Sequence, residues 1–317
     1  MRESAASSSP KTHWAEIREA GFVGGMRFLF LVYKFGGAWL FRGLLFFVML
    51  WFFTTRPLAR RASLEYLARL YEASGGATPA ANWRNSFRHF MSFAETILDK
   101  MLACDPNREP PPCLVSGAEH VQPLFDSGRG ALMITAHLGN VELCRRLARE
   151  HVKVRVTVLM HTQNAQAFNQ ILRALNPKME VDILQVANLD IATAALLSER
   201  IEAGGLVVIA GDRVPLTPEG ATLALPFLGA PAHFPLGPYI LAAALGCPVF
   251  TLFGVRNADG FTITVRPLAK RIILPRRERQ QAVMPYLSAY LAALTEECQK
   301  NPLQWFNFFP FWAQPLS

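Results

Sequence analysis

The sequence is poor in charged residues and in cysteine. Charged side chains make up 18% of its 317 residues, whereas hydrophobic side chains make up 51%. This composition is apolar for a soluble protein, and it indicates contact with lipid. The 5 cysteines are scattered, and no two of them form a Cys-x-x-Cys pair. This pattern predicts reduced thiols on the cytoplasmic side of a membrane and argues against a disulfide framework.

Several motifs with known chemistry are missing. The sequence has no P-loop, no Gly-x-Gly-x-x-Gly and no Gly-x-Ser-x-Gly, which argues against an NTPase, a dinucleotide enzyme and a serine hydrolase. It also lacks His-Glu-x-x-His and Cys/His clusters, so we expect no metal site. The net charge of +8 suits an anionic membrane surface, a phosphorylated lipid or an acidic carrier protein. Without zinc-finger spacing or a long Lys/Arg run, nucleic acid is not an expected partner.

The N-terminal third of the chain is helical in character. We expect a loose segment over residues 1–20, an apolar anchor over 21–61, and a helical lead-in and linker over 62–112, with its two helices separated at 74–79. Within the anchor the longest uncharged run, Gly43 to Thr55, is short of the ~20 residues that a spanning helix needs. The anchor could still cross the membrane once if Arg42 snorkels, or lie in the interface with Arg56 to Arg61 at the anionic face. A buried helical hairpin is the alternative.

The remaining residues, 113–317, alternate between strands and helices. This order predicts an α/β domain with a largely parallel central sheet covered by helices. The predicted strands are 131–136, 152–159, 181–184, 206–210, 249–255 and 261–268, and the predicted helices are 141–150, 165–175, 191–203, 239–245 and 277–300.

The stretch from His137 to Glu142 follows the first of these strands. If His137 lies in a loop and Asn140 caps the next helix, Glu142 falls in the first helical turn and can reach back to the imidazole. A carboxylate that orients one ring nitrogen leaves the other free to accept a proton. Gly139 would allow a close backbone approach, and the positive helix end suits a developing oxyanion. A surface histidine beside a helix-start glutamate is the alternative.

A second group of polar residues follows the strand 206–210. Asp212 and Arg213 should open onto the same edge of the sheet as His137, because active sites of such sheets lie at the carboxyl ends of the strands. Arg213 could bind a phosphate or polarise a carbonyl, or be a solvated surface residue. The next stretch, Leu225 to Pro238, is rich in Pro and Gly and predicts an irregular apolar loop, which could line an acyl channel or be an ordinary connection.

Taken in order, these parts resemble the bacterial lipid A late acyltransferases and related glycolipid acyltransferases such as the phosphatidylinositol mannoside enzymes. The resemblance covers roughly residues 20 to 312. It rests on the apolar anchor with its basic end, His137-x4-Glu142, Gly211-Asp212-Arg213, the block Pro226 to Ala232, Leu241 to Val249, and Gln304-Trp305-Phe306.

The resemblance implies a membrane-associated acyltransferase at the cytoplasmic side of the bacterial inner membrane, working without cofactor or metal. His137 would be the general base and Glu142 its orienting acid. An acyl carrier protein or acyl-coenzyme A would supply the acyl group, and a hydroxyl or amine of a lipid or glycolipid, such as a lipid A precursor, would accept it. The implied substrate contacts are Asn140, Asp212, Arg213, Arg173 and, for the fatty chain, Phe227.

Two other functions fit the same residues. His137 could activate water and hydrolyse a thioester or ester, or the chain could bind lipid without catalysis. The sequence also departs from the lipid A enzymes at one point, because Ala136 stands where they commonly have Asn before the histidine. This departure is closer to the glycolipid-type branch and leaves the acceptor open.

Overall fold

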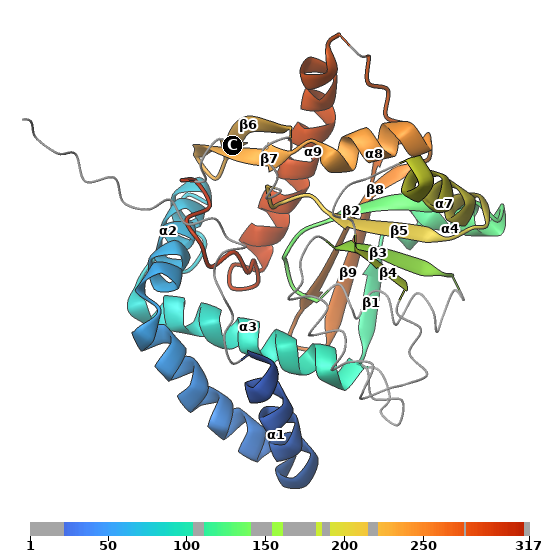
Figure 1. Cartoon of the computed structure of the whole chain (residues 1–317). Helices are drawn as coiled ribbons and strands as arrows, with labels where there is room; N and C mark the ends of the chain where they lie inside the picture. Colours follow the sequence, from blue (N-terminus) through green and yellow to red (C-terminus); the bar gives the residue numbers. More distant parts are fainter. Residues whose placement is uncertain are drawn as a thin grey trace, which may run out of the picture.

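A central sheet organises the computed structural model, which describes residues 22–103, 111–140, 154–160, 182–185, 191–214, 221–275 and 277–313. These residues form a seven-stranded sheet in the order β1-β9-β8-β2-β5-β3-β4 (Figure 1). Every neighbouring pair in it is parallel except β8 and β9. The predicted α/β class with a mostly parallel sheet is therefore confirmed. The strands are β1 (Cys113–Ser116), β2 (Ala131–Thr135), β3 (Val156–Met160), β4 (Asp182–Gln185), β5 (Leu206–Ala210), β8 (Val249–Arg256) and β9 (Phe261–Ala269).

The central strand β2 is apolar from Ala131 to Ile134 because both of its faces are covered. Leu132 and Ile134 pack into the larger hydrophobic core, and Ala131 and Met133 point into a second core on the opposite face of the sheet. Successive side chains of a strand alternate between faces, so a buried parallel strand needs apolar residues at every position.

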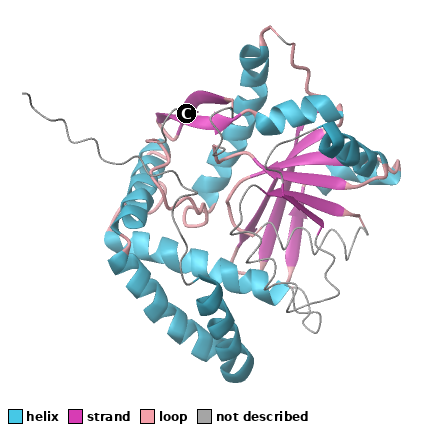
Figure 2. Cartoon of the chain, in the orientation of Figure 1, coloured by secondary structure: helices cyan, strands magenta, loops and turns pink. Residues whose placement is uncertain are grey.

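Helices cover the sheet (Figure 2). Within the described part of residues 113–317, the helices are α4 (Ala118–Asp126), α7 (Ile191–Glu202), α8 (Gly237–Leu245) and α9 (Arg279–Lys300). Three of them, α7, α8 and α9, confirm predicted helices within two residues at each end. The buried face of α9 carries Val283, Leu287, Tyr290 and Leu294 at helical spacing. The helices predicted at 141–150 and 165–175 lie outside the described residues.

Three N-terminal helices lie together beside the sheet (Figure 1). They are α1 (Phe22–Thr55), α2 (Pro57–Ala73) and α3 (Trp83–Ala103), and α1 is kinked at Gly37. Phe41, Leu45, Met49 and Phe53 recur every four residues along α1 and pack against α3. The predicted break between two lead-in helices is confirmed by the segment that separates α2 from α3.

The opposite side of α1 is exposed. Trp39 is 86% exposed, Phe47 66% and Trp51 56%, and these three rings are called the aromatic face below. No helix among the described residues is by itself long and apolar enough to cross a membrane; α1 from Trp39 passes such a test only together with α2, across a bend of 93°. One side of α1 is thus packed against α3 and the other is exposed.

The irregular loop predicted for 225–238 is wrong, because most of this stretch is regular. β6 (Thr222–Phe227) and β7 (Ala230–Pro235) form an antiparallel hairpin, and α8 begins at Gly237. The connecting residues Leu228 and Gly229 have φ angles of 49° and 81°, as a tight two-residue hairpin turn requires. The hairpin has only two strands, so both have an edge where a proline removes no hydrogen bond of a larger sheet.

Candidate active site

Two neighbouring strands bring the predicted base together with a carboxylate. β2 ends at Thr135 and β5 ends at Ala210, and these two residues are paired in the parallel register. His137 and Asp212 each lie two residues beyond, at the carboxyl edge of the sheet. His137 Nδ1 is 2.7 Å from Asp212 Oδ1, and the His137 backbone N–H donates to Asp212 Oδ2 at 2.9 Å. The prediction that both residues open onto one edge is confirmed.

Asp212 is fully buried and accepts four hydrogen bonds. Besides the two from His137, its Oδ2 accepts from the Trp305 indole at 3.1 Å and from the Asn307 amide at 3.0 Å. Burial alone would raise the pKa of Asp212, but the His137 contacts and the charge of Arg213 hold this pKa well below its usual value. Asp212 is therefore ionised at neutral pH. The sequence predicted a substrate contact for it; the structure instead encloses its carboxylate among protein donors.

The ionised Asp212 fixes the form of His137. A carboxylate only accepts hydrogen bonds, so Nδ1 carries the hydrogen and Nε2 has a free lone pair in the neutral ring. Burial and the charge of Arg213 lower the pKa of His137 below its ordinary value, although Asp212 acts in the opposite direction. The side chain is 36% exposed, and Nε2 has no hydrogen-bond partner among the described residues. The imidazole is thus a neutral base with an accessible acceptor.

The loop after His137 is held by a close backbone contact. Gly139 has a φ of 61°, and a Cβ placed on it would lie 2.0 Å from the carbonyl oxygen of Gly254. This close approach lets the Asn140 N–H bond that same oxygen at 2.6 Å. The predicted close approach at Gly139 is confirmed. Asn140 itself is buried, so it lies in the wall of the site, and its contact with substrate stays a prediction.

Arg213 lies beside the pair but points to the C-terminal segment. Its Nε donates to Asn307 Oδ1 at 2.8 Å, and its Nη2 donates to the Phe306 carbonyl at 3.0 Å. Because Arg213 binds the amide oxygen of Asn307, the amide nitrogen must face Asp212. Arg213 therefore orients a donor of Asp212. Its predicted contact with a substrate phosphate stays a prediction.

The segment Gln304 to Asn307 is the part of the site that sequence reasoning missed. Its backbone pairs with the histidine loop: the Phe306 N–H donates to the His137 carbonyl at 2.7 Å, and the Gln304 carbonyl accepts from Gly139 N–H at 2.8 Å. Trp305 in this aromatic stretch is fully buried. A buried indole needs an acceptor, and this need, together with the place of Gln304-Trp305-Phe306 in the family resemblance, is the signal in the sequence that could have pointed to the site.

Three other predicted site residues stand apart from this geometry. Glu142 and Arg173 lie outside the described residues, so their roles stay predictions. Phe227 is fully buried, with its ring against Trp305, Phe234 and Trp312. It belongs to the aromatic core, which does not fit the fatty-chain contact that the sequence predicted for it.

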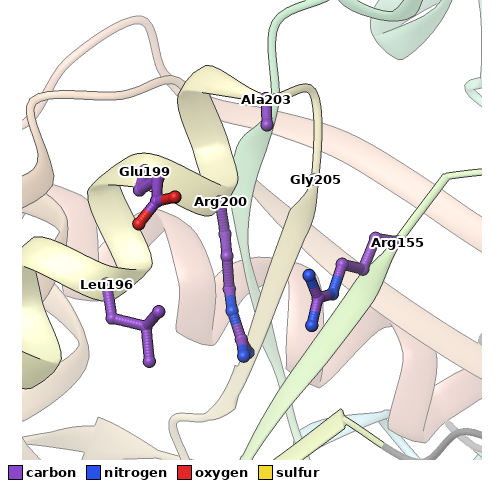
Figure 3. Close-up of a pocket in the computed structure, with 6 residues that line it drawn as sticks. All are labelled: Arg155, Leu196, Glu199, Arg200, Ala203 and Gly205. Atoms are coloured by element: carbon purple, nitrogen blue, oxygen red, sulfur yellow. The ribbon is translucent and has the colours of Figure 1, made fainter.

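Two cavities among the described residues are lined by residues other than His137 and Asp212. One, of about 210 Å³, is formed by Arg155, Leu196, Glu199, Arg200, Ala203 and Gly205 (Figure 3). Arg155 and Gly205 directly precede β3 and β5, so this cavity is at the amino edge of the sheet, opposite the His137–Asp212 pair. A second, of about 490 Å³, separates Leu225 and Pro226 from α9. No group of three or more His, Cys, Asp or Glu within the described residues could hold a metal ion.

Comparison with known proteins identifies the family. A family model described as bacterial lipid A biosynthesis acyltransferase matches residues 42–314. A comparison with curated proteins finds no match. The matched range is most of the chain and contains His137, Asp212 and the segment Gln304 to Asn307. The chain therefore belongs to the bacterial lipid A biosynthesis acyltransferase family, and it is an acyltransferase.

Proposed function

We propose that the enzyme moves a fatty acyl group from an acyl thioester, on an acyl carrier protein or coenzyme A, to a hydroxyl or amine of a lipid or glycolipid such as a lipid A precursor. The single observation that carries this proposal is the contact between His137 Nδ1 and the buried Asp212, 2.7 Å long. It presents a neutral imidazole with Nε2 as proton acceptor, which is what direct attack by a hydroxyl on a thioester requires.

The reaction needs no covalent enzyme intermediate. Nε2 of His137 takes the proton of the acceptor hydroxyl while the oxygen forms a bond to the thioester carbonyl carbon. The carbon–sulfur bond then breaks, and the departing thiolate takes the proton back from the imidazolium. Asp212 stabilises the positive charge that exists between these two transfers, and it keeps the ring in the productive tautomer. General base catalysis of this kind contributes about 10²- to 10⁴-fold to the rate.

Asp212 is our first choice as the orienting acid, and Glu142 remains a second candidate. The sequence predicts a role in the site for both carboxylates. Asp212 contacts His137, whereas Glu142 lies outside the described residues. A direct comparison of Asp212→Asn with Glu142→Gln ranks them. The residue that orients the base should cost the larger loss in kcat.

We further propose that α1 lies in the membrane interface at the cytoplasmic side of the inner membrane. Its aromatic face is exposed, and the exposed Arg56 and Arg61 follow directly where α1 ends. Aromatic rings favour the headgroup region, and arginines attract anionic lipids. An in-plane helix would leave its other side on α3, as the packing of Phe41 and Phe53 requires. This orientation would bring a lipid acceptor to the protein without extracting it into water.

The test compares lipid extracts by mass spectrometry from cells with the intact chain, His137→Ala, or the control His120→Ala, each confirmed by immunoblot in the membrane fraction. His120 is half-exposed on α4, so its substitution should change nothing. Loss of one acyl mass from a single lipid class in His137→Ala alone supports the transferase and names its acceptor. Released fatty acid without an acylated lipid would favour a hydrolase, and identical lipidomes would favour non-catalytic lipid binding.

A further inference from the structure

We propose that His89 is a positioning residue for the His137–Asp212 pair and that it acts through Trp305. His89 belongs to α3, one of the N-terminal helices, and is fully buried. Its Nε2 lies 2.9 Å from the Trp305 carbonyl, 216 residues away in the sequence. This inference rests on the proposed function, since it assigns a second residue to the same site.

The hydrogen-bond partners determine the tautomer of His89. A carbonyl oxygen only accepts, so Nε2 must carry the hydrogen. Nδ1 is then an acceptor, and the Ser63 hydroxyl, 3.0 Å away, donates to it. Ser63 in turn accepts from the Ser86 hydroxyl at 2.9 Å. Burial lowers the pKa of His89 to about 4, which keeps the ring neutral and this arrangement intact. Each polar atom of the chain Ser86, Ser63, His89 thus has a defined role.

Trp305 joins this chain to the catalytic pair. Its carbonyl accepts from His89, and its indole donates to Asp212 Oδ2 at 3.1 Å. The peptide groups on either side of it bind the histidine loop, through Gln304 O and Phe306 N. A displacement of the Trp305 backbone would therefore disturb a donor of Asp212 and the backbone partner of His137 together. His89, on α3, holds the carbonyl of Trp305 from the side of the N-terminal helices.

The surrounding rings allow little compensation. The His89 ring lies 4.6 Å from that of Phe308 and 5.4 Å from that of Tyr66, and Tyr66 also lies 5.0 Å from Trp305. In such a close-packed setting a lost hydrogen bond is not replaced by water, and the Trp305 carbonyl would keep only its longer contact, 3.2 Å, with the Asn307 N–H.

Two amide substitutions separate the two nitrogens of His89. In His89→Gln the side-chain amide nitrogen reaches the place of Nε2 and keeps the donor to Trp305. In His89→Asn the amide reaches only the place of Nδ1, so it keeps the Ser63 contact and loses Trp305. Both variants are assayed as full-length protein with acyl carrier protein carrying a lauroyl group and a lipid A precursor in mixed micelles.

We expect His89→Asn to lower kcat by about ten- to a hundredfold with little change in KM, since small misplacements of catalytic groups have effects of this size. We also expect the acid limb of its pH–rate profile to move upward, because an Asp212 with one donor fewer attracts the His137 proton more strongly. His89→Gln should restore both kcat and the pH profile. Equal kcat in the two variants, or a change in melting temperature alone, would overturn the proposal.

A double-mutant cycle with Trp305→Phe tests the path of the effect. This substitution keeps a ring in the core and removes the indole N–H. If His89 acts through Trp305, the loss caused by His89→Asn should be smaller in the Trp305→Phe background, because only the part carried by the backbone remains, whereas additive losses would contradict it. If His89→Asn folds poorly, Trp305→Phe is assayed by itself. It should lower kcat and move the acid limb upward, and an unchanged kcat and pH profile in this variant would overturn the proposal. An intact enzyme that transfers no acyl group would refute the proposed function instead.

Discussion

Replacing Asp212 by Asn should prevent His137 from acting as a general base while preserving the shape of the site. The Asp212 carboxylate accepts four hydrogen bonds, one at Oδ1 from His137 Nδ1 and three at Oδ2. An asparagine has one acceptor oxygen and one donor nitrogen. Its oxygen will take the Oδ2 place, where three donors converge, and its amide nitrogen will face His137 Nδ1. Since two donors cannot face each other, His137 must change tautomer and carry its hydrogen on Nε2.

A neutral His137 that carries its hydrogen on Nε2 has no free lone pair there, so it cannot take the proton of the lipid hydroxyl. We therefore expect kcat at neutral pH to fall by about 10²- to 10⁴-fold, the whole contribution of a general base. KM should change little, because Asp212 is buried and the shape of the site is kept. The assay is the initial rate of acyl transfer against acceptor concentration, with thermal unfolding measured on the same samples.

The matched control is Asp259→Asn, which changes the same group in an exposed turn and should leave kcat unaltered. An unfolded variant would also lose activity. The Asp212 variant must therefore be shown to be folded at the assay temperature before a loss of kcat is assigned to the base. A kcat within about tenfold of the intact enzyme would refute the reasoning. Another carboxylate, with Glu142 the first candidate, would then have to orient His137.

Three further outcomes follow from the same geometry. His137 must be neutral to act, and its pKa is lowered from the ordinary value of 6.5. We therefore expect kcat/KM to fall as the pH drops through a value below 6.5, and an acid limb of the pH–rate profile above 6.5 would contradict this. Gly139→Ala places a methyl group against the Gly254 carbonyl at a positive φ, so chemical denaturation should show a loss of about 2 kcal/mol or more, whereas Gly43→Ala, which meets no atom, should not. Trp39→Glu with Trp51→Glu should weaken sedimentation with anionic vesicles without changing the melting temperature, and Leu114→Glu, on an exposed strand of the sheet, serves as its control.

The central architecture could be predicted because it follows from local patterns. The strand β5 and the first four residues of β2 are continuous apolar runs, and each strand is followed by a polar residue with chemical function. Parallel strands place such residues at one edge, so the meeting of His137 with Asp212 was predictable in outline. Which atoms meet was not, because the orientation of each side chain depends on donors from the far end of the chain.

The hairpin of β6 and β7 shows where composition misleads. Its prolines predict irregular structure when the sequence is taken alone, since a proline lacks the N–H that a sheet interior uses. In the fold, Pro226 faces Pro231 in a pair of strands that has no further neighbour in its sheet. The energetic objection to proline applies to central strands only, and sequence does not reveal which strands are central.

Trp305 shows why core and site are not separate categories here. The burial of an indole leaves its N–H without water, and the burial of the Asp212 carboxylate leaves its oxygens without solvating hydrogens; each would be costly alone. Placed 3.1 Å apart, each removes the other's desolvation cost, and the carboxylate remains ionised beside His137. The aromatic segment therefore contributes packing and sets the charge of the catalytic pair through the same side chain. Because His89 holds the backbone of that residue from α3, the stability of the N-terminal helices and the state of the base become linked properties.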